Sequence, residues 1–221
     1  MNYTQNHNVK VISMIFGVTW AISGLHHGFF EMLQGWNPTV NLIISSIGPD
    51  QQQWIHGTDE AFTLVPNYRM TGMLSISLSL TIIYWSIFRL NRENSGRVFL
   101  ILFIMLCLVG GGIGFIPYFL LTYYFIRFIR NPTPAWMHVL PVGLTRFSKR
   151  IWKWLLTITV TLFLLALEIS VFGWIPGVDD PDDVLLICWI LLGVSLILLP
   201  LTYLSAMVST LSTNKRPHEP Y

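Results

Sequence analysis

The chain has 221 residues, of which 53% are hydrophobic and only 11% are charged, and its formal net charge at pH 7 is +2. So small an excess, carried by Lys and Arg at the ends of apolar runs, does not indicate a protein that binds nucleic acid. The two cysteines, Cys107 and Cys188, lie inside apolar runs and predict neither a disulfide framework nor a cysteine metal motif.

Apolar residues fall in blocks of about twenty or more, the length that crosses the ~30 Å hydrocarbon core of a bilayer. These blocks have neither the polar face of an amphipathic helix nor the alternation of a barrel strand. The sequence therefore predicts an all-α, polytopic integral membrane bundle that forms one domain over residues 1–221. Small residues at Gly72, Ser75 and Ser79 share one helix face, which predicts close packing against another helix.

We expect five to six membrane segments, because the apolar stretch 98–128 is too long for one ordinary crossing. The cluster Gly110–Gly114 predicts a turn between two short helices, and the alternative is one long, kinked helix. Asn37-Pro38-Thr39 is a plausible helix start, so a short helix is expected in the outer loop. The expected segments are about 9–33, 68–90, 98–111, 114–129, 151–174 and 184–204, with the outer loop at 34–67 and a cytoplasmic loop at 130–150.

Lys and Arg collect in the short cytoplasmic loops of membrane proteins. They flank residues 98–128 on both sides, whereas residues 34–67 contain neither type and the charged residues of 177–183 are all acids. This pattern predicts a multi-pass protein of the cell membrane with both termini cytoplasmic. The first apolar run is expected to be a retained helix rather than a cleaved signal.

Two pentapeptides share the frame His-Gly-x-x-Glu, one at His27–Glu31 and one at His56–Glu60. His27 and Glu31 are four residues apart and share a helix face, so they can meet each other or one ligand. In the second frame, Thr58 also suits a helix N-cap, with acids in the first turn. We expect the outer loop to fold back so that His56 or Glu60 lies over His27 and Glu31.

Glu168 lies within a long apolar run, where an ionisable group normally faces a partner or a water-filled cavity. We expect it to face the bundle interior, in the same outer half of the membrane as His26 and His27. The alternatives are a carboxyl group that only holds neighbouring helices and a His–Glu pair that only orients the first helix.

The ionisable residues of the outer half define a candidate site. Imidazole and carboxylate groups together suit Zn²⁺ or another first-row divalent metal, although the cofactor is not identified and no known metal signature is present. The candidate catalytic residues are His27, Glu31, His56 and Glu168, and the candidate metal ligands are His26, His27, Glu31, His56 and Glu60.

These observations favour an outward-facing His/carboxylate site that acts on or binds a lipid-like or small apolar ligand. Two alternatives stay open: a proton- or cation-coupled transporter or channel, and a non-catalytic accessory or assembly subunit. A continuous pathway needs polar groups in both halves of the membrane, and here they gather in one. The expected partners are membrane lipids and a small apolar ligand, without nucleic acid, and a homo-oligomer stays open.

Overall fold

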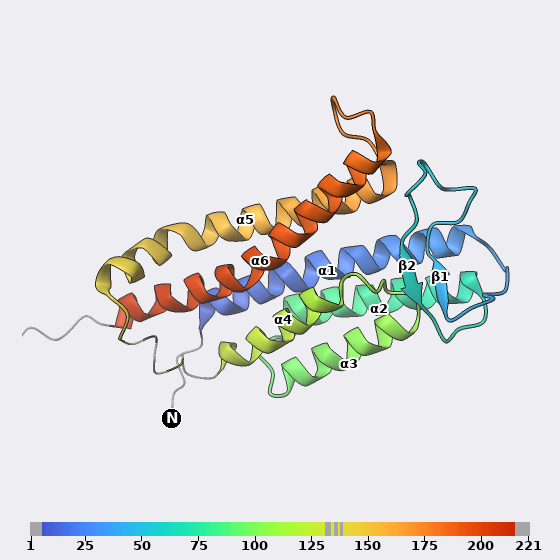
Figure 1. Ribbon diagram of the computed structural model, residues 1–221. Coiled ribbons are helices and arrows are strands. Elements are labelled where there is room, and N and C mark those ends of the chain that lie inside the picture. Colours follow the sequence, from blue (N-terminus) through green and yellow to red (C-terminus); the bar gives the residue numbers. More distant parts are fainter. Residues whose placement is uncertain (1–5, 131–133, 135–136, 138, 215–221) are drawn as a thin grey trace, which may run out of the picture.

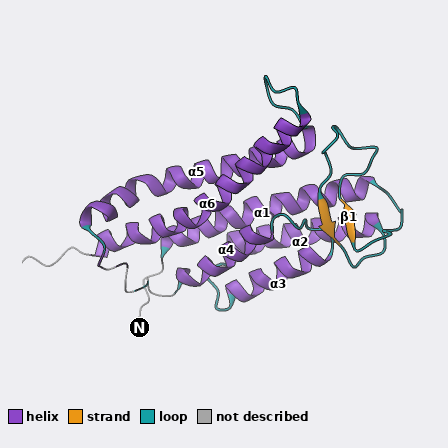
Figure 2. Ribbon diagram, in the orientation of Figure 1, coloured by secondary structure: helices purple, strands orange, loops and turns teal. Residues whose placement is uncertain are grey.

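The computed structural model describes residues 6–130, 134, 137 and 139–214. Long helices run side by side along the molecule, and a small sheet closes one end of the bundle (Figures 1 and 2). The elements in chain order are α1 (His7–Leu33), β1 (Ile43–Ser45), β2 (Glu60–Phe62), α2 (Tyr68–Phe88), α3 (Ser95–Leu108), α4 (Ile116–Ile126), η1 (Arg127–Ile129), α5 (Val142–Phe172) and α6 (Pro181–Asn214).

Within the described residues, four helices are long and apolar enough to cross a membrane: α1, α2, α5 and α6. The shorter helices α3 and α4 are also apolar, and they are separated at Val109–Phe115, where the glycine cluster predicts a break. The all-α, polytopic membrane bundle expected from the sequence is therefore present. Whether α3 and α4 cross the membrane or form a re-entrant pair stays a prediction.

The helices form two closely packed pairs, α1 with α2 and α5 with α6, and α4 contacts both α1 and α6. Helices α1 and α2 approach so closely that a Cβ atom on Gly28 would collide with the Gly72 carbonyl, and one on Gly72 with the Gly28 carbonyl. The predicted small-residue face of α2 is buried at Gly72, Ser75 and Ser79. Small side chains thus bring the two backbones together, as in other membrane bundles.

Aromatic rings fill the space between the helix pairs. Trp20 of α1 packs on Tyr118 of α4 and Phe163 of α5 with ring centroids 4.8 and 4.5 Å apart. Its indole nitrogen donates a 2.8 Å hydrogen bond to Thr122 Oγ1. This cluster belongs to the core of the bundle. The ionisable residues His27 and Glu31 of α1 lie beyond it, toward the end of the helix.

The expectation of a helix in the outer loop is wrong. The 34–67 loop contains no helix; it forms the antiparallel pair β1–β2, with Ile44 opposite Ala61. The Ile43-Ile44 pair suits a strand, and the second strand accepts backbone hydrogen bonds from the segment between α3 and α4. Helix α5 begins at Val142, before the expected membrane segment at 151–174, and the basic residues of its first turns are exposed. Where this helix enters the membrane stays a prediction.

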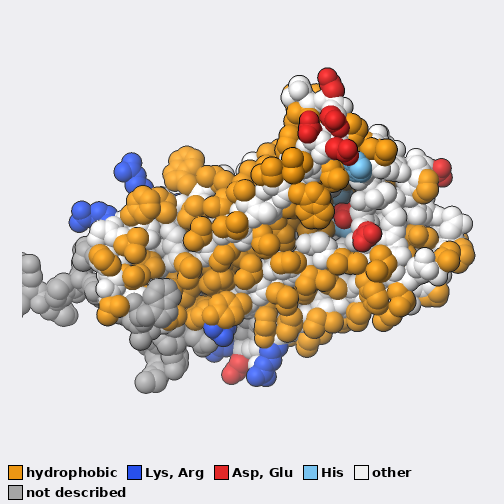
Figure 3. All heavy atoms as spheres, viewed as in Figure 1, with side chains coloured by type: hydrophobic (Ala, Val, Ile, Leu, Met, Phe, Trp, Pro, Cys, Tyr) orange, Lys and Arg blue, Asp and Glu red, His pale blue; other side chains and the backbone are white. Residues whose placement is uncertain are grey.

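The two ends of the bundle differ in charge. Figure 3 shows Asp, Glu and His gathered at the end that carries β1 and β2, which we call the sheet end, and Lys and Arg mainly toward the other, the basic end. The first residues of α1 and the last of α6 both lie at the basic end (Figure 1). The described helices α1 and α6 therefore begin and end, respectively, at the same end of the bundle. Which side of the membrane this end faces stays a prediction.

Candidate functional site

Two ionisable side chains of α1 are buried at the sheet end. His27 is 2% exposed and Glu31 is 0% exposed, and no other Asp, Glu, His, Lys or Arg of the described chain is buried. Their four-residue spacing places them on one face, which the 34–67 loop covers. Because burial of a polar group without a partner costs free energy, their contacts define the site.

Ser46, the residue that follows β1, connects the two side chains. Its Oγ lies 2.7 Å from His27 Nδ1 and donates a 3.1 Å hydrogen bond to Glu31 Oε1. The serine is held there by Gln34 at the end of α1, whose Nε2 donates to the Ser45 and Ser46 carbonyls at 3.0 and 2.7 Å. Sequence reasoning did not select Ser46, because a serine in an apolar loop carries no spacing signal.

Asp59 approaches the other side of the imidazole. Its Oδ2 lies 3.0 Å from His27 Nε2, but the ring nitrogen does not point squarely at this oxygen, so the contact is electrostatic rather than a well-directed hydrogen bond. Asp59 is 30% exposed, whereas His27 is 2% exposed. A contact chain therefore runs from buried Glu31 through Ser46 and His27 to a carboxylate at the surface.

The segment between α3 and α4 closes over this chain. Gly110 donates its N–H to the Phe62 carbonyl at 2.9 Å, and Ile113 donates to the Glu60 carbonyl at 3.1 Å. Gly110 (φ +105°) and Gly112 (φ +84°) lie in the left-handed region that favours glycine. A Cβ on Gly110 would collide with the Glu31 carboxyl group, and one on Gly112 with His27 Nε2. The glycine cluster is thus required by both the turn and the site.

The two pentapeptides do come together, but not through the residues that the sequence favours. His56 instead makes a 2.8 Å contact with Asp182 at the start of α6, and the Glu60 side chain is exposed. Asp59 makes the contact with His27. The expectation that His56 or Glu60 lies over His27 and Glu31 is therefore wrong in its residues, because strand formation at β2 turns Glu60 outward.

The expectation for Glu168 is also wrong, since its side chain on α5 is exposed rather than directed into the bundle. It lies four residues before the end of α5, or about 6 Å from the helix end at ~1.5 Å per residue, where a carboxylate can reach the aqueous boundary. Glu168 is close enough to His26 of α1 to interact electrostatically. The His26 ring packs edge-on against Phe30, 5.1 Å between centroids.

The five candidate metal ligands are not gathered into one group. Among the residues that the structure describes, no three His, Cys, Asp or Glu side chains are close enough to hold a metal ion. His27 and Glu31 belong to the contact chain, and His56 pairs with Asp182. Neither His26 nor Glu60 joins these contacts. The predicted metal set is therefore not carried further.

A pocket of about 360 Å³ opens beside Asp59, between α4, α5 and α6. Its polar lining is concentrated near the 34–67 loop, at Trp54, His56, Thr58 and Asp59, and the rest is mostly apolar. Along α6 it extends from Leu185 to Leu196, about 16 Å at ~1.5 Å per residue. The exposed Trp189 and Gly193 leave it open at the side of the bundle.

Trp54 fixes the loop at the rim of this pocket. Its indole nitrogen donates a 3.0 Å hydrogen bond to the Ser170 carbonyl of α5, and its ring lies against Gly173, where any Cβ would collide with it. The His56–Asp182 contact holds the same part of the loop to α6. The loop thereby joins the α5–α6 pair to the rest of the sheet end.

Comparison of the chain with protein-family models, with curated proteins and with solved structures finds no match.

The glycine cluster allows a direct test of this geometry. Gly110→Ala and Gly112→Ala should each lower the free energy of unfolding by about 1–3 kcal/mol, because each adds backbone strain and displaces Glu31 or His27. Gly114→Ala is the matched control, since its φ is not positive and a Cβ there meets nothing within 4 Å. Thermal or denaturant unfolding of the detergent-solubilised variants measures the difference. Equal stability of all three would contradict the described turn.

Proposed function

We propose that the sheet end binds an amphipathic, lipid-like ligand, with its apolar chain in the pocket between α4, α5 and α6 and its polar end beside Asp59. The observation that carries the proposal is the pocket itself. Its volume of about 360 Å³ lies in the range of known ligand sites, and the ionisable His and Asp side chains that line it, His56 and Asp59, both belong to the 34–67 loop. The side opening at Gly193 admits a ligand directly from the bilayer.

The charge of the pocket indicates the class of polar end. Its lining contains Asp59 but neither Lys nor Arg, and Asp182 lies beside His56 at the rim. Trp54 and Trp189 present aromatic rings, which attract cations. A cationic head group is therefore favoured over an anionic one.

The position of the buried ionisable groups favours a binding site over a continuous pathway. His27 and Glu31, the only buried residues of this kind in the described chain, both belong to the sheet end. A transporter that moves protons or cations through the bundle needs such groups along its whole length. An accessory subunit needs no open pocket next to a buried carboxylate–imidazole pair.

The ligand proposal is tested in nanodiscs of neutral lipid with a brominated alkylammonium amphiphile, which quenches tryptophan fluorescence when it binds beside Trp54 and Trp189. We expect Asp59→Asn to weaken its binding about tenfold, as the loss of one well-placed charge does. The control Asp179→Asn should change it little, because that carboxylate is exposed and does not line the pocket. Equal binding of a brominated alkyl sulfate, or no effect of Asp59→Asn, would contradict the proposal.

One specific observation favours a second function, acyl transfer. Ser46 Oγ lies 2.7 Å from His27 Nδ1, and Asp59 Oδ2 lies 3.0 Å from His27 Nε2. A serine hydroxyl, an imidazole and a carboxylate are thus arranged one after another in space, as in enzymes that use an activated serine. In such a reaction the Ser46 hydroxyl would turn its hydrogen from Glu31 Oε1 to His27 Nδ1, and His27 would accept that proton as Ser46 Oγ attacks the carbonyl carbon of an ester. The bond from the acyl carbon to the alcohol oxygen of the ester would break, and His27 would return the proton to the leaving alcohol. Ser46 is only 1% exposed and does not line the pocket, so the loop would have to open first.

A fluorophosphonate probe distinguishes the two functions. If acyl transfer takes place, mass spectrometry should find the probe on the peptide that contains Ser46, and His27→Ala should reduce labelling by roughly 100-fold or more, in line with general-base catalysis. Ser45→Ala is the matched control, because the Ser45 hydroxyl donates to the Ile47 carbonyl instead. Absence of labelling in the wild-type chain leaves ligand binding as the function of the site.

We further propose that the sheet end faces the outside of the cell and that both termini are cytoplasmic. The support is the concentration of Lys and Arg at the basic end. With Glu60→Cys, a membrane-impermeant maleimide added to intact cells should label the protein, and with Lys149→Cys it should not. Both positions are exposed, so the reverse result would mean the opposite orientation.

A further inference from the structure

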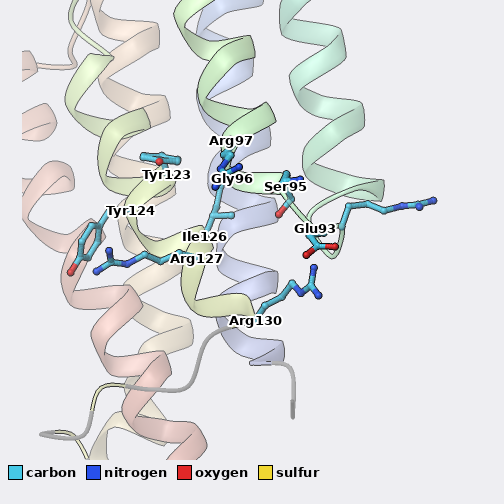
Figure 4. Close-up of a pocket in the computed structure, with 11 residues that line it drawn as sticks. Glu93, Ser95, Gly96, Arg97, Tyr123, Tyr124, Ile126, Arg127 and Arg130 are labelled. Atoms are coloured by element: carbon cyan, nitrogen blue, oxygen red, sulfur yellow. The ribbon is translucent and has the colours of Figure 1, made fainter. Parts of the chain in front are cut away.

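A second pocket, of about 560 Å³, lies at the basic end between the start of α3 and the end of α4 (Figure 4). Four arginines line it, Arg92, Arg97, Arg127 and Arg130, against one acid, Glu93. In the part of the chain that the structure describes, no carboxylate oxygen lies within 4.0 Å of these guanidinium groups. Within the described chain, their positive charges are therefore not offset by ion pairs.

The arginines come from three elements and are partly pre-ordered. Arg127 stacks on Tyr124, with 4.0 Å from its guanidinium carbon to the ring centroid, and Figure 4 shows the two side chains lying together at one side of the pocket. Arg130 extends from the other side toward Glu93 and the first turn of α3 (Figure 4). Such stacking holds a guanidinium group in place at little entropic cost.

The first turn of α3 faces the same pocket. Its N-cap residue, Asn94, is in a left-handed conformation (φ 64°) and makes no side-chain capping hydrogen bond. In this turn the Ser95 N–H donates to the Arg92 carbonyl and the Val98 N–H donates to the Asn94 carbonyl. The N–H groups of Gly96 and Arg97 have no acceptor among the described residues, and both residues line the pocket. A helix N-terminus of this kind carries partial positive charge and favours anions.

Ser95 contributes a hydroxyl group to the same pocket. Its side chain is only 6% exposed and lines the pocket. Its hydroxyl makes no hydrogen bond with any residue that the structure describes, although its carbonyl accepts one of 3.2 Å from Trp85 Nε1. The hydroxyl is therefore accessible to an oxygen atom in the pocket.

We propose that this pocket binds a phosphate group. Guanidinium groups, a hydroxyl and the N–H groups of an uncapped helix start are the donors that recognise the oxygens of a phosphate. The pocket lies at the basic end of apolar helices and beside Tyr123 and Tyr124. Tyr, Lys and Arg side chains are enriched at membrane interfaces, where lipid phosphates lie. The phosphate belongs either to an anionic lipid or to a soluble phosphate compound, and the two sources are distinguished below.

Two measurements on the purified full-length chain test the site and its source. Native mass spectrometry counts short-chain phosphatidic acid retained by the protein, with phosphatidylcholine as the neutral comparison. Equilibrium dialysis with radiolabelled inorganic phosphate measures binding of the soluble anion. Retention of phosphatidic acid alone assigns a lipid phosphate, and binding of inorganic phosphate assigns a soluble one.

The variants decide whether the pocket is responsible. Arg97→Gln and Arg130→Gln should each weaken binding about tenfold, and Ser95→Ala severalfold, as charged and neutral donors differ in strength. Glu93→Gln should strengthen binding, because it removes the one opposing charge. The matched control is Arg150→Gln, an exposed arginine of α5 at the same end but outside the pocket, which should bind as the wild type does. Failure of both probes to bind, or equal losses in Arg97→Gln and Arg150→Gln, would overturn the proposal.

Discussion

The burial of the Glu31 carboxyl group is the constraint that shapes the sheet end of the bundle. A carboxyl group at 0% exposure needs partners, and none of the described Lys or Arg side chains reaches it. Only Ser46 donates to it, on Oε1, while Oε2 has no hydrogen-bond partner in the described chain. The 34–67 loop has to return across the helix ends to bring that serine, and this return produces β1, β2 and the contact between the two pentapeptides.

Much of the architecture follows from residue patterns that act locally. Apolar run length predicts the spanning helices, and Asn67, which accepts a hydrogen bond from the Met70 N–H, starts α2 where the sequence indicates. The break at Gly110–Gly114 was predictable because positive charge on both sides of residues 98–128 conflicts with a single crossing. Each of these features is determined by neighbouring residues in the chain and by the thickness of the membrane, so a single sequence is enough to predict it.

The contents of the site were less predictable, because they depend on how distant segments meet. His27 and Glu31 stand out in sequence as a charged pair on an apolar helix, and the structure buries both. Ser46 and Asp59 contact them only because β1 pairs with β2, and a three-residue strand register leaves no strong sequence signal. Glu168 shows the opposite failure, since its apolar neighbours in sequence suggest burial, whereas its side chain lies on an exposed face of α5.

The same unwound segment that covers Glu31 also makes the pocket beside it. Because the chain from Val109 to Phe115 pairs with β2 instead of continuing as helix, α4 starts only at Ile116, below the level of the sheet. Its first turn, with Phe115 and Pro117, then forms one wall of the pocket, and α6 forms the other. A continuous helix through the glycine cluster would close this space and leave the β2 backbone groups without partners. The buried carboxyl group and the open pocket are therefore two consequences of one break in the helical bundle.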